Sequence, residues 1–511
     1  MRFFILFVIL LFSAPTVSHA EWRKAVSPSF VVYGDMKEAP LLAFTKKVER
    51  FDTFLRRKFG IAGESAPARM TIFITNSSTP VGSLIAGKND KFIKGFYTNG
   101  PNGPVAILQQ TRGEGQFDLD ADTILFHEYV HHFMLQYFPA AYPAWFVEGF
   151  AEFYSTTEFN KGGFASYGRP AYHRAYELVA GKDLAIEKLL VTDVDALKEG
   201  ERSSLYARGW LLTHYLTFAP DRDGQLSVYI AAINNGVDGL DAARKAFGDL
   251  AALNKGLNAY RDKNSISYLT QREVTPASDA IVLTLVEAGE AATMIERIKV
   301  RRHVTPEERP ALIASLTNAK KKFPNSVAIN ILLAQIHHEN EDDKQAAMAA
   351  DAALLQNPDN PDALLYRAVA AVGELVRANT DDVAQWKTAR AMIVKANRAD
   401  PENPYPLFHY YKSFQQQGIR PIVAAGSGLA KAFELLPQDT NLRFTYAQYL
   451  IDQNKLVAAK SVFKPMAYAP HSGSGGNYAR SMVEKLDRAI KAGGSKADFY
   501  RIADEPEAPA P

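Results

Sequence analysis

The segment around residue 130 places two histidines, His127 and His131, four positions apart, with Glu128 next to the first. Aspartates between residues 118 and 122 suit the first turn of a helix, and the apolar residues that follow support a helix over 124–137. Residues four apart on a helix lie on one face. Both imidazoles can then reach one zinc ion, and Glu128 is placed to act on a zinc-bound water. The alternative is a half-buried helix that carries two hydrogen-bonded histidines.

A second segment, residues 145–152, supplies carboxylates at a suitable distance along the chain. A catalytic zinc site uses three protein ligands and keeps one position open for water. Glu148 follows His131 by seventeen positions, which leaves room for a loop and the start of a second helix. Glu152 lies one turn later on the same face, where a carboxylate can hold the outer nitrogen of a ligating histidine. Because the chain has no cysteine, histidine and carboxylate are the zinc donors that remain.

These two segments resemble the gluzincin metallopeptidases, which join an HExxH motif on one helix to a glutamate ligand on the next. Residues 145–151 read WFVEGFA, which is similar to the W-L-x-E-G-F-A segment of the aminopeptidase N family. Residues 205–210 read LYARGW, which is similar to that family's Y-E-K-G-A segment. The resemblance extends over about residues 25–265. Its nearest look-alikes are the compact secreted proteins called peptidase MA-like.

Carried over residue by residue, the resemblance implies a site for one Zn²⁺ ion. The implied zinc ligands are His127, His131 and Glu148. Glu128 is the implied general base, Tyr206 the implied oxyanion donor and Glu152 the implied acid behind the ligands. The implied activity is that of a hydrolase, a metalloprotease that acts on a peptide or protein substrate. The chain has no G-x-M-E-N segment, with which aminopeptidase N relatives hold a free amine. An endopeptidase is therefore favoured over an aminopeptidase.

Residues 21–308 are expected to form an α+β zincin-like metallopeptidase domain with a small mixed sheet, the HExxH helix and a helical subdomain. Residues 41–59 have apolar side chains at helical spacing and end before Gly60. Between 95 and 108, two β-rich runs flank a turn-rich segment, the pattern of a hairpin. In gluzincins an edge strand above the zinc binds the substrate backbone by strand addition. Residues 104–109 are the candidate for that strand, and an ordinary sheet strand is the alternative.

The sequence changes character near residue 309, where alanine-rich helices with proline punctuation begin. Five prolines, at 324, 358, 401, 437 and 470, are separated by 34, 43, 36 and 33 positions. Helix–turn–helix units of about this period resemble tetratricopeptide repeats (TPR), which bury their apolar faces only by stacking. Residues 309–495 are therefore expected to form an all-α TPR-like solenoid that can bind a protein partner. An unrelated helical bundle is the alternative. Glycine-rich residues 473–476 predict a linker, and residues 496–511 predict a disordered tail.

The first twenty residues indicate a signal peptide. One arginine precedes an apolar run from Phe3 to Phe12, and residues 18–20 offer a cleavage site of small residues. An uncleaved anchor is the alternative. No later segment has eighteen consecutive apolar residues, so no membrane span is expected in the mature protein. We expect an exported protein, periplasmic or secreted. Its formal charge of +2 gives no reason to expect nucleic acid as a partner.

The sequence therefore predicts an exported zinc-dependent peptidase with a repeat domain that binds substrate or partner. Two alternatives stay open. In the first, the chain is a zinc-binding TPR scaffold with weak or no catalysis, which recruits protein partners in the periplasm. In the second, the zinc centre hydrolyses a bond other than a peptide bond.

Overall fold

The structure is a computed structural model of the chain. The structure describes residues 21–63, 65–76, 79–85, 94–100, 103–110, 120–181, 184–191, 197–272, 280–468 and 473–504. The predicted signal peptide, and residues 505–511 of the predicted tail, lie outside the described residues. Within these described ranges, no helix has both the length and the apolar character needed to cross a bilayer.

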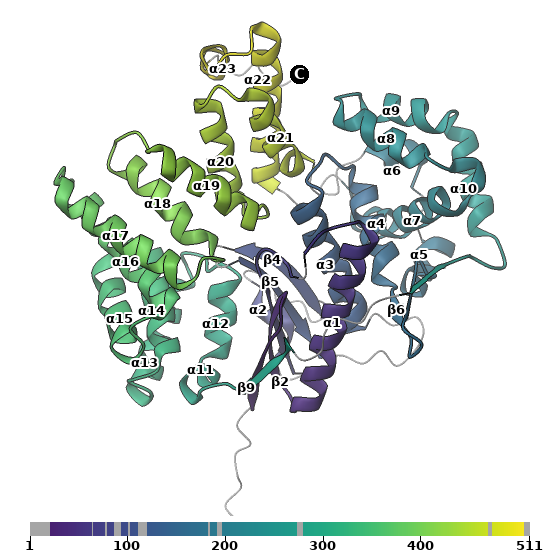
Figure 1. The fold of residues 1–511 in the computed structure, drawn as a ribbon. Coiled ribbons are helices and arrows are strands. Elements are labelled where there is room, and N and C mark those ends of the chain that lie inside the picture. Colours follow the sequence, from purple (N-terminus) through teal and green to yellow (C-terminus); the bar gives the residue numbers. More distant parts are fainter. Residues whose placement is uncertain are drawn as a thin grey trace, which may run out of the picture.

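A six-stranded sheet forms the base of the first part of the chain (Figure 1). Its order is β4 (Gly95–Gly100), β5 (Gly103–Gln109), β3 (Met70–Thr75), β2 (Phe30–Asp35), β1 (Trp22–Val26) and β9 (Val282–Leu285). Strands β2, β3 and β5 run parallel, and the other neighbours pair antiparallel. The prediction that residues 104–109 form the edge strand is wrong, since β5 lies between β3 and β4. Its continuous apolar run is buried, which suits an inner strand covered on both faces, and β4 forms the edge.

Helices cover both faces of this sheet. They are α1 (Glu38–Lys58) and α3 (Ala121–Tyr137) on one face, and α2 (Val81–Leu84) and α12 (Met294–Arg301) on the other. Successive strand residues point to opposite faces. Ile72 and Leu108 accordingly join the core under α1 and α3, while Phe73 and Ile107 join the core under α12. Packing on the sheet therefore fixes the position of α3, which carries the two histidines, next to the edge strand β4.

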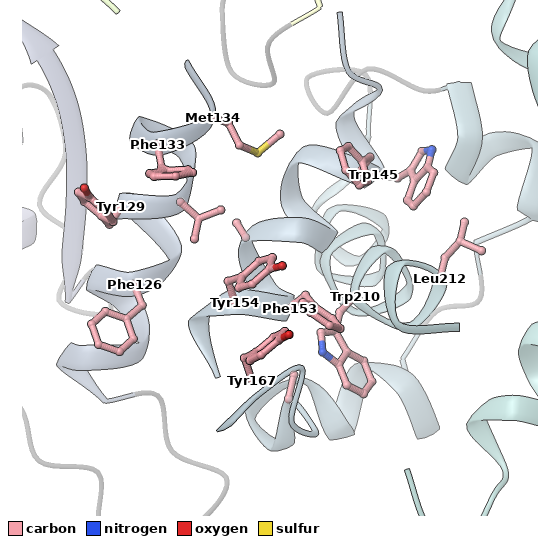
Figure 2. Packing of buried hydrophobic residues seen from close by; sticks show 14 of the residues in the cluster. Phe126, Tyr129, Phe133, Met134, Trp145, Phe153, Tyr154, Tyr167, Trp210 and Leu212 are labelled. Carbon is pink, nitrogen blue, oxygen red and sulfur yellow. The ribbon is translucent and has the colours of Figure 1, made fainter. Parts of the chain in front are cut away.

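Beyond α3 the chain forms a helical subdomain and a three-stranded sheet. Its elements are α4 (Ala144–Ser155), β6 (Glu158–Phe159), β7 (Phe164–Tyr167), η1 (Tyr172–Arg174), α5 (Ala175–Val179), α6 (Ile186–Val191), α7 (Glu199–Phe218), η3 (Pro220–Arg222), α8 (Gln225–Asn234), α9 (Gly239–Phe247), α10 (Leu250–Arg261) and β8 (Leu269–Arg272). Aromatic side chains of α3, α4 and α7, among them Phe133, Phe153 and Trp210, belong to one core cluster (Figure 2). Tyr154 and Tyr167 are buried in this core.

Helices α4 and α7 cross with their backbones almost in contact. A Cβ atom on Gly149 would lie 2.2 Å from the carbonyl oxygen of Gly209, and one on Gly209 would lie 2.5 Å from the carbonyl oxygen of Trp145. Only glycine at both positions lets the two helices approach this closely. The crossing brings the carboxylates of α4 beside Tyr206 of α7.

The second part of the chain is a TPR-like stack of helices that curves around the sheet (Figure 1). Its elements are α11 (Ala288–Ala292), α13 (Arg309–Lys322), α14 (Val327–Glu339), α15 (Asp343–Gln356), α16 (Pro361–Arg377), α17 (Val383–Ala399), α18 (Pro404–Gln416), α19 (Val423–Leu435), α20 (Thr440–Asp452), α21 (Leu456–Ala467), α22 (Gly473–Ala492) and α23 (Lys496–Ala503). The first helices of the pairs, α14, α16, α18 and α20, each begin after a residue whose side chain accepts a backbone N–H: Ser326, Asn360, Asn403 and Asp439. These N-cap residues recur at nearly the spacing predicted for the repeats. The longest interval between them corresponds to the long helices α16 and α17.

Two predictions for the end of the chain differ from the structure. Residues 473–476 form the first turn of α22 and are not a linker. Residues 496–503 form helix α23, within the segment predicted to be disordered. Ser495 and Asp498 form a capping box for α23, and Phe499 and Ile502 are buried in the core of the last helices. Burial of these two apolar side chains stabilises helix α23, although the composition of the tail as a whole is polar.

The two parts of the chain share helix α12. Met294 and Ile298 of α12 pack on the sheet, whereas Val300 packs on the first helices of the stack. Further along, Ala68 packs among the helices α16 and α18, and Arg69 lies 3.7 Å from Glu402. The starts of α16 and α18 therefore face the sheet domain.

Candidate metal centre

Helix α3 keeps its histidine motif on the one face that is not fully buried in the core. Its N-cap residue Asp120 accepts a hydrogen bond of 2.7 Å from the backbone N–H of Thr123. Residues 125, 126, 129, 130 and 133 are buried in the core. His127, Glu128 and His131 are half-buried on the remaining side, which faces α4. The helical spacing predicted from the sequence is present.

Three side chains converge on one point between α3 and α4. His127 Nε2 lies 3.1 Å from His131 Nε2, 3.3 Å from an oxygen of Glu148, and the same oxygen lies 3.4 Å from His131 Nε2. Ligand atoms of a tetrahedral zinc ion with bonds near 2.1 Å are separated by about 3.4 Å. The three distances match this value, so the donor set fits zinc in number, type and spacing. In the part of the chain that the structure describes, no other group of this kind is found.

Glu148 is 1% exposed, and its environment determines its charge. Burial by itself raises the pKa of the carboxyl, but the two histidines outweigh burial and hold the pKa well below its usual range. For His127, burial lowers the pKa, yet Glu148 and Glu152 outweigh it and raise the pKa to about 9. The carboxylates therefore create a negative electrostatic potential between these residues, which favours the binding of a divalent cation.

Glu152 lies behind the first histidine. One of its oxygens lies 3.4 Å from His127 Nδ1, on the side of the ring opposite to the converging Nε2 atoms. A carboxylate at this position can orient the ring and favour the tautomer that leaves Nε2 as an acceptor. The resemblance implies this role for Glu152, and the role stays a prediction.

Two residues that the sequence did not assign hold Glu152 in turn. Arg174 donates hydrogen bonds of 2.9 and 2.6 Å to one carboxylate oxygen, and His173 Nε2 lies 2.7 Å from the other. Burial raises the pKa of Glu152, but Arg174 and His173 outweigh burial and keep the pKa well below its usual range. No spacing rule links residues 173 and 174 to residue 152, because loop geometry brings them together.

Glu128 and Tyr206 flank the converging atoms. Glu128 borders both cavities that open beside the site, and Tyr206 borders one of them. The ring of Tyr206 stacks on that of His127 with centroids 6.0 Å apart, and the Arg174 guanidinium lies 5.1 Å from the Tyr206 ring centroid. Burial and the nearby carboxylates raise the pKa of Tyr206 well above its usual value. Tyr206 therefore keeps its proton and can donate a hydrogen bond.

Two other histidines on these helices have structural roles. His132 is buried beside the ligand His131, and burial lowers its pKa to about 3. Its Nδ1 lies 3.1 Å from the hydroxyl of Tyr97 and 3.2 Å from the amide nitrogen of Gln438. His214 is also buried, and its ring lies 2.9 Å from the hydroxyl of Tyr260. Both histidines are neutral parts of the core.

Comparisons with known proteins return no match to a family model and none to a curated protein. A solved structure of a thermophilic TPR protein from Thermus thermophilus is 16% identical, with a TM-score of 0.32, over 39% of this chain and 100% of that chain. The structure of yeast Tom70 is 13% identical, with a TM-score of 0.27, over 64% of this chain and 69% of that chain. At these scores, the TPR-like architecture rests on the helix pairs described above.

The expectation of hydrolase and metalloprotease relatives is wrong. One of these similar structures is described as a TPR protein, and neither is described as a metalloprotease. A motif of about eight residues around a metal can be shared without a similarity that extends along the chain.

The geometry predicts that Glu148→Gln weakens zinc binding by at least about 100-fold, because even residues that only orient a ligand contribute about 10- to 100-fold. Zinc affinity would be measured by competition with a chromophoric chelator. Glu158→Gln is the control, since the side chain of Glu158 is 65% exposed at β6 and away from the converging atoms. Tight binding by Glu148→Gln would exclude Glu148 as a ligand.

Proposed function

We propose that this chain is an exported zinc enzyme that cleaves peptide bonds in an extended polypeptide. The observation that carries the proposal is the convergence of His127, His131 and Glu148 within 3.4 Å, with Glu128 beside them. Two histidines and one carboxylate leave a fourth position open, the arrangement of a catalytic zinc site. Export rests on residues 1–20 of the sequence.

The residues around the centre have separable tasks. When bound, zinc polarises a carbonyl group and makes a coordinated water more acidic. Glu128 accepts the proton of the attacking water and passes it to the leaving amine. Tyr206, which keeps its proton, donates a hydrogen bond to the oxygen of the attacked carbonyl. Glu152, with Arg174 and His173 behind it, keeps the His127 ring in place.

The edge strand β4 supplies a place for the polypeptide. It lies next to α3, and a Cβ atom on Gly95 would lie 2.6 Å from the Ile124 side chain, so glycine is needed for this approach. Among the described residues, β4 pairs with β5 on one side and with no strand on the other. Its outer backbone groups can bind an extended chain by strand addition. This role, which was expected of residues 104–109, moves to residues 95–100.

The test is cleavage of a mixed peptide library by purified protein, followed by mass spectrometry. Cleavage should disappear when a chelator removes the metal and return when one equivalent of zinc is added. Zinc-loaded protein that leaves every peptide intact would rule out peptide-bond cleavage. An equal rate with and without bound zinc would show that the cleavage comes from a contaminant.

A zinc-binding scaffold that recruits protein partners is the second candidate. It is favoured by exposed valines at the starts of three successive second helices: Val383 of α17, Val423 of α19 and Val457 of α21. Solenoid proteins build extended binding surfaces from corresponding positions of successive repeats. The two candidates are separated by the same library, because the scaffold predicts one bound zinc and no cleavage.

A further inference from the structure

A cavity of about 290 Å³ opens directly beside the metal centre. Glu128, His131 and Glu148 border it at one end. The C-terminal half of α3 and the start of α4 form its floor, with Met134, Leu135 and Val147. Tyr97 and Thr98 of the edge strand β4 form one side. The cavity therefore adjoins both the converging metal-binding atoms and the strand on which we place the polypeptide.

The remaining wall comes from the helical stack, about three hundred residues away in sequence from α3. Thr440 at the start of α20 and Pro465, Met466 and Tyr468 at the end of α21 line the cavity. Pro465 lies inside α21, where it has no backbone N–H to donate to the preceding turn. Without α20 and α21 the cavity would be an open groove on the surface of α3.

Polar contacts hold this wall in place. The amide nitrogen of Gln438 lies 2.7 Å from the side-chain oxygen of Gln136 and 3.2 Å from His132 Nδ1. The ammonium group of Lys464 donates a 2.6 Å hydrogen bond to the carbonyl of Asn234. Gln438 is 2% exposed, so the contact excludes water. These contacts hold the start of α20 and the end of α21, which carries Met466, against the rest of the chain.

The chemistry of the cavity is apolar away from the metal. Among the described residues that line it, the charged groups and the histidine are those of the centre itself. The other lining side chains are aliphatic, aromatic or neutral polar. A charged side chain placed there would lose its hydration without a partner, whereas an aliphatic or aromatic one would gain by burial. The volume suits one large side chain and is at the lower limit for a small-molecule site.

We propose that this cavity binds a large apolar side chain of the polypeptide, next to the bond that is cut. In this arrangement α20 and α21 of the helical stack select the substrate. The inference rests on the proposed function, and it gives the stack a role inside the site in addition to any role on its outer surface. Met466 and Tyr468 are the residues that determine the selectivity.

The test measures binding without cleavage, in the full-length zinc-loaded chain with Glu128→Gln. Labelled peptides of about ten residues that differ at one central position, leucine in one and aspartate in the other, would be compared by fluorescence anisotropy. We expect the leucine peptide to bind at least about 10-fold more tightly, because burying this side chain is worth a factor of that order. Met466→Asp should reduce the preference to about 2-fold or less, because the new carboxylate makes burial of leucine less favourable.

Controls separate selectivity from folding. Met348→Asp introduces the same charge on α15, where Met348 is 58% exposed, and should leave the preference unchanged. Tyr468→Ala removes part of the wall without adding charge and should lower the affinity for the leucine peptide. Thermal melting would show that each variant is folded.

Two results overturn the inference. One is equal affinity for the leucine and aspartate peptides in the parent chain. The other is an unchanged preference in folded Met466→Asp and Tyr468→Ala variants. If the preference is present but the wild-type chain cleaves neither peptide, the proposed function fails while the assignment of the cavity stands.

Discussion

Glu128→Gln is expected to bind one zinc ion per chain with the wild-type affinity and to cleave peptides about 10²- to 10⁴-fold more slowly. The amide has nearly the same shape as the carboxylate but cannot accept the proton of the attacking water. Glu128 is next to the ligand His127 and is not one of the converging donors, so the metal should stay bound. Zinc content and turnover of a peptide substrate would be measured on the same preparation.

Glu158→Gln is a suitable control, because the side chain of Glu158 is 65% exposed on β6, outside the cavities that border the centre. It should change neither zinc content nor turnover. Full activity of Glu128→Gln would mean that another group moves the proton, and the proposed mechanism would be incorrect. Loss of zinc in the variant would instead indicate that Glu128 belongs to the donor set.

Gly149→Ala is expected to destabilise the chain by about 1–3 kcal/mol or more and to weaken zinc binding. The added Cβ would lie 2.2 Å from the carbonyl oxygen of Gly209 and 2.7 Å from Thr213 Oγ1. The nearest atom belongs to the backbone of α7, so a change of rotamer cannot relieve the overlap. Helices α4 and α7 must separate, which moves Glu148 away from the histidines. Thermal unfolding in chelator and zinc affinity would report the two effects.

Gly200→Ala provides the matched control on α7, because a Cβ atom at Gly200 meets nothing within 4 Å. Alanine is the better helix former, so this variant should be at least as stable as the wild type. If Gly149→Ala melted at the wild-type temperature, the close crossing of α4 and α7 would not be present in solution.

Local spacing made the centre of the site predictable. His127 and His131 share a face because the α-helical repeat dictates it, whatever the rest of the fold. Glu148 and Glu152 share a face for the same reason, and the resemblance supplied the pairing of the two helices. The period of the repeats was also visible, since each helix start needs only its own cap and proline nearby.

Contacts between distant segments could not be predicted in this way. The order of strands in the sheet depends on pairing across the chain, so β5 was placed at the edge when β4 lies there. Arg174 reaches Glu152 through a loop whose path no periodicity describes. The helix at residues 496–503 was missed because its two buried side chains, Phe499 and Ile502, find their partners in preceding helices.

The contact between Gln438 and His132 spans 306 positions of sequence. During synthesis, the motif helix is therefore complete long before the segment that shields its flank has been made. Any product that ends before residue 438 would carry all the side chains of the candidate metal centre and lack one side of the cavity beside it. Such a shortened chain would expose apolar residues of α3 to water, and under the proposed function its choice of peptides would be broader than that of the whole molecule.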